Sequence, residues 1–474
     1  STSRRQRQMC IRDRKYIDSH RGEMLEDIKT LCRINSEKMP YQEGMPYGEG
    51  ACRALETALS MAEGYGFAIS NYDNYVGTVD FGGTESQLDI LAHLDVVPAG
   101  EGWTVTKPFE PVEQDGKLYG RGTADDKGPA VAALYAMRAV KELNIPLKKR
   151  VRLILGTDEE CGSSDIAHYY AVEKEAPMTF SPDGAFPVVN IEKGHLNCEF
   201  EAEFEPSQAL PRVKSVTAGT KVNVVPGKAY AVFEGLDDDM VREAGNQVEK
   251  ETGVSFELVG KDGCLEITAC GAGAHASTPQ EGKNAATALL LLITRLPFAA
   301  CRQMEVIRSL TELIPHGDTE GKALGVAMAD ELSGALTLAF DILEITDSRM
   351  HGIFDSRTPI CGNEDNVLKP VAEKMAERGI TVLTKEMLPP HHVDGNSPFV
   401  KTLLGAYEEY TGRKGECVSM GGGTYVHDLK NGVAFGAALP ETDNRMHGAD
   451  EFAVIDELLL SAKIFAQVIA DLCC

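Results

Sequence analysis

The sequence lacks an apolar stretch that could cross a membrane. No run approaches the roughly 20 apolar residues that a transmembrane helix needs, and the first residues contain no apolar core of a signal peptide. It also lacks C-x-x-C pairs, because its 12 cysteines stand singly apart from Cys473 and Cys474. Zinc ribbons and disulfide frameworks need paired cysteines, so neither is indicated. We therefore expect a cytoplasmic protein with reduced cysteines and no membrane partner.

Positive charge is scarce as well. Lysine and arginine number 47 against 72 aspartates and glutamates, which gives a formal net charge of −25. A field of this sign repels a phosphate backbone, so the balance argues against a nucleic-acid partner. The one clear basic cluster near the start, RRQRQ at 4–8, is interpreted as a loose end rather than a binding arm.

What the sequence does contain is an alternation of strand and helix patterns. The apolar runs at 88–92, 151–155 and 433–439 suit strands buried in the middle of a sheet. Between the first two, residues 128–143 have helical periodicity, with Pro129 in the first turn. Strand, loop, helix and strand in this order predict an α/β domain.

A second domain is predicted by a change of pattern after residue 192. The segment NCEFEAEFEP alternates polar and apolar residues with a period of two, as a half-exposed antiparallel strand does. A chain of 474 residues is also long enough for two or three domains. We predict an α/β domain formed by residues 1–192 and 386–474, and interrupted by an inserted α+β domain over 193–385.

Histidines and acids collect where predicted strands end. The stretch LDILAHLDVVP ends a strand with His93 and Asp95, and LILGTDEECGS ends another with three acids. Further acids stand in GRGTADDKGP and TFSPDGAFP, and a late histidine in NRMHGADE. Each stretch alone also fits a helix cap, an Asp-Gly turn or a histidine satisfied at a sheet edge.

Together these stretches predict a paired metal site. The carboxyl ends of parallel strands form one rim, where ligand sites of open α/β sheets lie. Two imidazoles, one bridging carboxylate and two further carboxylates form the ligand set of two divalent ions that activate a water. Imidazole favours zinc, cobalt or nickel over magnesium, whereas the many oxygen ligands also suit manganese.

The motifs resemble those of a known family. H-x-D-V-V-P-x-G-x-x-W, G-R-G-x-x-D-D-K-G-P, D-E-E-x-G-S, S-P-D, H-A-S-x-P and a late His-Gly-x-x-Glu follow one another in the chain. In this order they resemble the M20 family of zinc-dependent peptidases, and within it the long bacterial dipeptidases of the PepV type. The resemblance implies a zinc-peptidase-like catalytic domain with a mixed sheet flanked by helices, and it makes the inserted domain a lid.

The resemblance also implies a set of metal ligands. His93, Asp125 and Asp183 would hold one ion, and Asp125, Glu160 and His447 the other, so that Asp125 bridges the two. Two divalent ions are implied as cofactors, with zinc as the first expectation and manganese or cobalt as alternatives.

Two catalytic roles beside the metals follow from the same resemblance. Asp95 would orient the ring of His93, which explains why the two residues stand on one face of a strand end. Glu159 would be the general base, which takes a proton from water and delivers it to the leaving amine. The resemblance further implies a cis peptide bond between Asp125 and Asp126.

Substrate-binding residues are implied for the inserted domain and for a late glycine-rich stretch. His275 in GAHASTP would polarise the scissile carbonyl, with Asn223 in VNVVP assisting. Arg357 in FDSRTP would bind the substrate carboxylate, and Gly422, in the centre of SMGGGTY, would line the same pocket. Relatives tend to read Ala-Arg where residues 426–427 are Val-His, a departure that could alter side-chain preference.

These features predict a metal-dependent dipeptidase that acts on short unblocked peptides. Another M20-type amidohydrolase, a deacylase of N-acyl amino acids, shares the metal motifs, but an insert of about 190 residues is far longer than the lid of such enzymes. A non-catalytic peptide-binding protein would be favoured by loss of Glu159 or of a metal ligand, and none is lost. Because the long insert can supply His275 internally, we expect a monomer, with a dipeptide as its substrate.

Overall fold

The computed structural model describes residues 15–474, so the basic cluster at 4–8 lies outside the described residues. The chain divides into two compact units. Unit 2 comprises Glu192–His391 and Ser419–Gly422, and unit 1 comprises the described residues before it, His392–Val418 and Gly423–Cys474. The predicted fold class is confirmed, because an α/β domain is interrupted in the chain by an inserted α+β domain.

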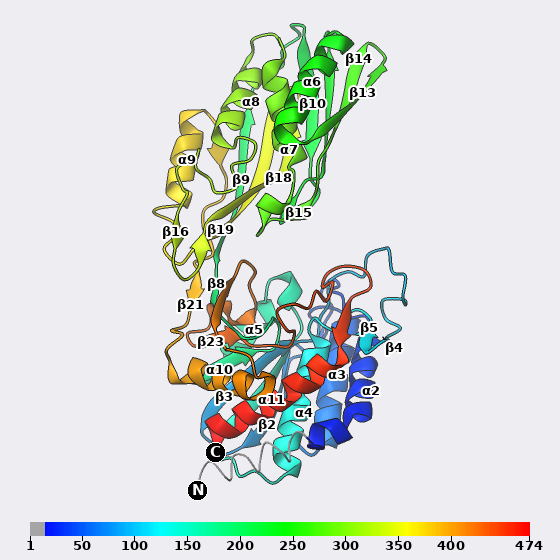
Figure 1. Ribbon diagram of the computed structural model, residues 1–474, viewed down its shortest axis with the longest axis vertical. Helices are drawn as coiled ribbons and strands as arrows, with labels where there is room; N and C mark the ends of the chain where they lie inside the picture. Colours follow the sequence, from blue (N-terminus) through cyan, green and yellow to red (C-terminus); the bar gives the residue numbers. More distant parts are fainter. Residues whose placement is uncertain (1–14) are drawn as a thin grey trace. The chain divides into compact units, whose positions relative to one another are not determined.

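Unit 1 is built on a mixed sheet. In the described residues it has nine strands, in the order β1-β2-β6-β3-β7-β23-β8-β21 with β22 beside β8. Strand β3, which Figure 1 labels, runs parallel to both of its neighbours, β6 and β7. The bounds are β1 Ala68–Tyr72, β2 Val76–Gly82, β3 Ser86–His93, β6 Arg150–Gly156, β7 Met178–Ser181, β8 Val188–Glu192, β21 His391–His392, β22 Cys417–Met420 and β23 Gly432–Ala434.

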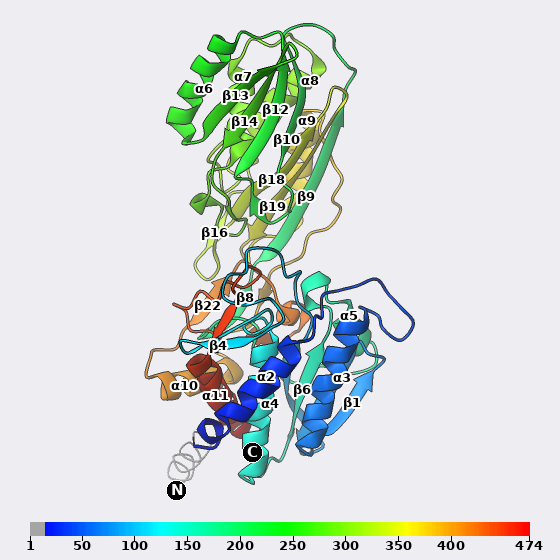
Figure 2. The ribbon, with the colours of Figure 1, turned by 90° about the vertical axis from the view of Figure 1, so that its right-hand side faces the viewer.

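Helices cover both faces of this sheet. Along β3, Leu88, Ile90 and Ala92 join the large hydrophobic core, whereas Leu91 joins a smaller core on the other face. Apolar positions on both faces explain why the sequence reads as a continuous apolar run. The large core is shared with α2 Arg21–Cys32, α3 Glu49–Gly64, α4 Lys127–Glu142, α10 Pro398–Thr411 and α11 Ile455–Cys473, and the smaller one with α5 Ser164–Tyr170 and the short helix η3 Tyr425–Asp428. Figure 2 labels these α-helices.

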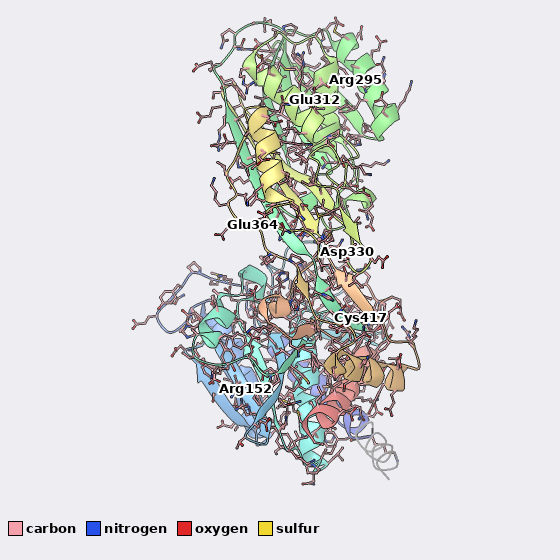
Figure 3. All side chains as sticks on the ribbon, turned by 90° about the vertical axis from the view of Figure 1, so that its left-hand side faces the viewer. Arg152, Arg295, Glu312, Asp330, Glu364 and Cys417 are labelled. Atoms are coloured by element: carbon pink, nitrogen blue, oxygen red, sulfur yellow. The ribbon has the colours of Figure 1, made fainter. Side chains whose placement is uncertain are left out.

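The smaller core ends at a buried ion-pair cluster around Arg152 on β6, which Figure 3 labels. Its guanidinium donates to both oxygens of Asp80, at 2.8 and 3.0 Å, and to the hydroxyl of Tyr169 at 2.8 Å. A separate small sheet of unit 1 contains β4 Val112–Gln114, β5 Lys117–Tyr119 and β24 Phe452–Val454. It ties the segment before α11 to the segment before α4.

Unit 2 is an antiparallel sheet with helices on one face. Its strands follow the order β13-β14-β12-β10-β18-β19-β9-β20. In β9, alternate residues such as Leu196 and Phe200 are buried in the core, and the residues between them are more exposed. The bounds are β9 Gly194–Glu203, β10 Arg212–Ala218, β12 Lys228–Glu234, β13 Ser255–Lys261, β14 Cys264–Cys270, β18 Thr337–Ile345, β19 Arg349–Thr358 and β20 Thr381–Val382, with helices α6 Asp238–Thr252, α7 Ala285–Arg295, α8 Arg302–Leu313 and α9 Leu368–Glu377.

Two details differ from the sequence expectations. The apolar run at 433–439 forms only a short strand, since β23 ends at Ala434, and the peptide bond between Gly436 and Ala437 further along is cis. The segment at 389–398 is not a plain linker, since it contains β21. Within residues 15–474, none of the helices has both the length and the apolar character required to cross a bilayer.

Candidate active site

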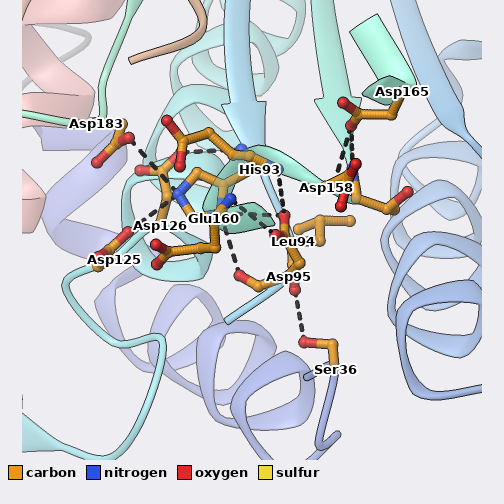
Figure 4. A network of polar contacts seen from close by, with 12 residues as sticks. Ser36, His93, Leu94, Asp95, Asp125, Asp126, Asp158, Glu160, Asp165 and Asp183 are labelled. Carbon is orange, nitrogen blue, oxygen red and sulfur yellow. Dashed lines mark hydrogen bonds and ion pairs between the residues drawn. The ribbon is translucent and has the colours of Figure 1, made fainter. Parts of the chain in front are cut away.

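His93 is the last residue of β3, and its side chain is fully buried. Its Nδ1 lies 3.1 Å from the backbone oxygen of Asp95. Because a carbonyl can only accept, Nδ1 carries the proton, which leaves the lone pair of a neutral ring on Nε2. This Nε2 faces two carboxylates, with Asp125 Oδ1 at 3.0 Å and Asp183 Oδ2 at 3.5 Å (Figure 4). It makes no hydrogen bond, although it is buried.

Asp125 stands between two imidazoles. While its Oδ1 faces His93, its Oδ2 lies 3.0 Å from Nε2 of His447. The same His447 nitrogen lies 3.3 Å from Oε2 of Glu160. His447 adopts the left-handed region at φ 64°, which non-glycine residues rarely occupy and which is typical of constrained functional positions.

The described residues contain two groups of side chains whose ligand atoms lie within 4.8 Å of one another. One group is His93, Glu159 and Asp183, and the other is His93, Asp125 and Glu160. The sequence placed Asp125 rather than Glu159 beside Asp183. The structure therefore brings all five predicted ligands and Glu159 into one cluster, in which Glu159 is also close enough to bind a cation.

The charges of this cluster call for a cation. Burial raises the pKa of Glu159 well above its usual range, and burial together with Asp125 raises the pKa of Glu160 to about 7. Burial opposes ionisation of Asp125 too, but its contacts with His447 and His93, when these rings are protonated, hold its pKa below the usual range. A divalent cation would relieve this repulsion and would accept the unpaired lone pair of His93 Nε2, so the residues fit a metal site.

Asp95 does more than the sequence predicts. Its Oδ1 lies 3.4 Å from His93 Nδ1, as expected for a residue that orients the ring. In addition, its carboxylate accepts the backbone N–H groups of Glu159 at 3.2 Å and Glu160 at 3.1 Å. These two residues begin the short helix η1, Glu159–Cys161. The Asp95 carboxylate thus holds His93, at the end of β3, together with Glu159 and Glu160, which follow the end of β6.

A second positioning residue, Glu451, was not assigned a role from the sequence. Its Oε1 accepts three backbone N–H groups of the loop that carries Asp125, those of Gly122, Ala124 and Asp125 itself. Its Oε2 accepts from the buried guanidinium of Arg121 at 2.6 Å. The next residue of this loop, Asp126, follows a cis peptide, as the family resemblance implies, and accepts the backbone N–H of His93.

Tyr425 is a third such residue, and it belongs to the glycine-rich motif SMGGGTY. Its ring meets that of His93 edge-on, with 6.2 Å between centroids. Its hydroxyl donates at 2.5 Å to Asp165, which in turn accepts the backbone N–H groups of Thr157 and Asp158. The neighbouring Val426 packs in the smaller core, so this part of the Val-His departure serves packing rather than a substrate pocket.

Unit 2 holds the remaining predicted residues, Asn223, His275, Arg357 and Gly422. The strand pair β11 Val224–Val225 and β15 Ala274–His275 brings Asn223 and His275 together, and the N–H of Ala276 donates to the Asn223 carbonyl. The backbone N–H of Ser277 donates to Nδ1 of His275 at 3.1 Å. The proton of a neutral His275 ring is therefore on Nε2, which makes this nitrogen a hydrogen-bond donor.

Arg357 on β19 is nearly buried and already engaged. Its Nε and Nη2 donate to the two oxygens of Asp355, both at 2.7 Å, and Nη1 donates to the carbonyl of Gly421 at 2.6 Å. A side chain at Gly421 would collide with Ser277, since its Cβ would stand 2.8 Å from that of the serine. At Gly422, beside it, an added Cβ would meet only the terminal methyl group of Met420.

Comparison with known proteins assigns the chain to a family. Residues 90–471 match the family described as Peptidase family M20/M25/M40. The Beta-Ala-Xaa dipeptidase of Lactobacillus delbrueckii subsp. lactis is 36% identical over 471 residues, which cover 98% of this chain and 99% of that protein. This chain belongs to the M20/M25/M40 peptidase family. The resemblance inferred from the motifs is thereby confirmed.

Solved structures show the same fold for this M20 chain. Human carnosine dipeptidase 1 matches with a TM-score of 0.59 at 16% identity, covering 98% of this chain and 99% of its own. The aminoacylhistidine dipeptidase from Vibrio alginolyticus matches with a TM-score of 0.58 at 13% identity, covering 95% and 96%. Membership makes the chain a hydrolase of peptide bonds that uses divalent metal ions, in agreement with its carboxylate–histidine cluster.

Proposed function

We propose that this chain is a metal-dependent dipeptidase that hydrolyses short unblocked peptides. The observation that carries the proposal is the Asp125 carboxylate, which faces His93 with one oxygen and His447 with the other. A carboxylate in this position can bridge two cations. The similarity over nearly the full length to a protein named Beta-Ala-Xaa dipeptidase supports the substrate class.

We assign His93, Asp125 and Asp183 to one ion, and Asp125, Glu160 and His447 to the other. Zinc is the proposed metal because each set contains an imidazole, with manganese or cobalt as alternatives. When bound, such ions act as Lewis acids and make a water molecule acidic enough to attack a carbonyl at neutral pH.

Glu159 is the proposed general base. It takes the proton of the attacking water and later gives it to the leaving amine. Its backbone is held by Asp95, and this support fixes where the carboxylate stands relative to His93. The closeness of Glu159 to His93 and Asp183 supports the assignment, because a base for this water must lie beside the metal ligands.

We further propose that the same dipeptide is bound by residues of unit 2. His275 donates its Nε2 proton to the carbonyl oxygen as negative charge develops there, and Asn223 assists. Arg357 and Gly422 receive the terminal carboxylate of the substrate. The Ser277 contact supports the role of His275, because it keeps the proton on the nitrogen that must donate.

The test combines a substrate panel with one variant. Dipeptides should be hydrolysed, activity should be lost with a chelator and restored by divalent ions, and N-acetyl and N-succinyl amino acids should be poor substrates. Glu159→Gln should keep bound metal and fold but lose about 10²–10⁴-fold in kcat, because the amide cannot accept the proton. Glu63→Gln, an exposed replacement of the same kind, is the control. Near-normal kcat of Glu159→Gln, or faster hydrolysis of N-acyl amino acids than of dipeptides, would contradict the proposal.

A further inference from the structure

The contacts of Arg357 account for three of the five N–H donors of its guanidinium. Asp355 accepts one from Nε and one from Nη2, and the Gly421 carbonyl accepts one from Nη1. One donor on each terminal nitrogen is left. Two donors on neighbouring nitrogens match the two oxygens of one carboxylate. The Arg357 guanidinium can therefore still bind a planar anion while Asp355 holds it through Nε and Nη2.

Asp355 is itself held by a third residue. Nε2 of His195 lies 2.8 Å from Asp355 Oδ2, the oxygen that also accepts from Arg357 Nη2. Asp355 is fully buried, and although burial opposes its ionisation, the hydrogen bonds from His195 and Arg357 lower its pKa. An ionised carboxylate only accepts, so the imidazole donates to it.

The sheet explains why these three side chains meet. Strands β9 and β19 are neighbours in the sheet (Figures 1 and 2), and they run antiparallel. Their register pairs His195 with Arg357 and Asn197 with Asp355. The side chains of residues 195, 355 and 357 therefore lie on the same face of the sheet, opposite to the core face of Phe354. Two backbone hydrogen bonds with Leu388 further fix the position of His195.

We infer that His195 and Asp355 are positioning residues that set the direction in which Arg357 presents its last two N–H groups to the substrate carboxylate. This inference rests on the proposed function, because it gives Arg357 a carboxylate to bind. A long arginine side chain has many rotamers. The buried Asp355 carboxylate, which is itself held by His195, restricts Arg357 to one of them. Loss of the His195 contact would leave the Asp355–Arg357 pair with one hydrogen bond fewer. The two remaining N–H groups of Arg357 would then be misaligned with the substrate carboxylate.

The same two strands provide a matched control. His351 on β19 contacts Glu199 on β9 with Nε2 to Oε1 at 2.8 Å, the same kind of pair at the same distance. It shares the sheet face with His195 but has no contact with Arg357 among the described residues. His195→Phe removes the contact in question, His195→Gln keeps a side-chain N–H donor, and His351→Phe repeats the loss at the control pair.

The experiment measures kcat/KM for one dipeptide and for its C-terminal amide in the metal-loaded full-length enzyme. The selectivity is the ratio of the two values. We expect His195→Phe to lower the selectivity about tenfold, as loss of a hydrogen bond to a charged group does. The loss should come mainly through a higher KM for the dipeptide. His195→Gln should recover most of it, and His351→Phe should match the wild type. Asp355→Asn should lose more of the selectivity than His195→Phe. Thermal unfolding is recorded for every variant.

The outcomes separate the two levels of the argument. Wild-type enzyme that does not distinguish the dipeptide from its amide would refute the carboxylate-binding role of Arg357. A wild type that distinguishes them, together with folded His195→Phe and Asp355→Asn variants of unchanged selectivity, would overturn the positioning inference and leave the proposed function standing. Equal losses in His195→Phe and His351→Phe would also overturn it, because they would indicate general damage to the sheet.

Discussion

Asp89 offers a test of the electrostatics of unit 1. It lies on β3 with 2% of its surface exposed. Its Oδ2 accepts the backbone N–H of Ala176 at 3.3 Å, and its Oδ1 has no hydrogen-bond partner. Burial raises the pKa of Asp89 from 3.8 to about 7, although Arg152 opposes the shift. We expect Asp89→Asn to gain stability relative to the wild type as the pH rises.

The sign follows from proton binding. Between pH 3.8 and about 7 the folded protein keeps the Asp89 proton and the unfolded chain does not, so raising the pH favours the unfolded chain. Asparagine does not titrate and escapes this cost. A shift of about 3 pKa units, at 1.36 kcal/mol each, amounts to about 4 kcal/mol at full development. Part of this destabilisation of the wild type is already present at about pH 5. The difference in the free energy of unfolding between variant and wild type should therefore grow by about 2.5 kcal/mol between about pH 5 and about pH 8.

The assay is urea unfolding followed by tryptophan fluorescence at both pH values. Trp103 is the single tryptophan of the chain and lies in unit 1, so its signal reports the unit that contains Asp89. Other titrating groups are common to both proteins and cancel in the difference. Asp115→Asn, the same replacement at an exposed turn position, is the control, and the pH-dependent difference of Asp89→Asn should exceed that of the control. A difference for Asp89→Asn that stays constant or shrinks as the pH rises would refute the reasoning.

Two further predictions concern the metal loop and the assembly state. Glu451→Gln removes the charge partner of Arg121 and weakens the support of the Asp125 loop, so metal affinity should fall by roughly 10–100-fold. Metal titration checks this, with Glu441→Gln, which breaks an exposed pair with Arg413, expected to bind metal normally. We also expect a monomer, so light scattering should give the mass of one chain and specific activity should not fall on dilution. An obligate dimer would contradict that prediction.

Local periodicity accounts for much of what the sequence predicts correctly. The helix expected at 128–143 is α4, Lys127–Glu142, and the strands expected at 88–92 and 151–155 are β3 and β6. These elements are either short continuous apolar runs or have helical spacing of apolar residues, so the local pattern identifies them. His93 and Glu160 converge because their strands are parallel neighbours, which makes their carboxyl ends meet. The expectation of a paired metal site used only this rule and the residue types, whereas the assignment of ligands to each ion came from the family resemblance.

The supports of the site could not be derived in this way. The motif around His447 contains Glu451, but nothing in it indicates that this carboxylate accepts three N–H groups from residues 122–125, more than three hundred positions earlier. Asp95 was expected to orient a histidine, and its backbone contacts to residues 159–160 depend on how two loops fold together. Backbone acceptors are identified by position, and position is set by tertiary packing rather than by residue type.

The surroundings of Arg357 show where local reasoning ends. Asp355 precedes it by two residues in a strand, and the strand period places both side chains on one face, so this pair was open to prediction from the motif FDSRTP alone. The sequence gives His195 no role by contrast, because it matches no motif, and it lies 160 positions away from Asp355. Its place beside Asp355 exists only in the observed register of β9 on β19. A shift by one residue would turn His195 to the other face and remove the contact, whereas the Asp355–Arg357 pair would survive.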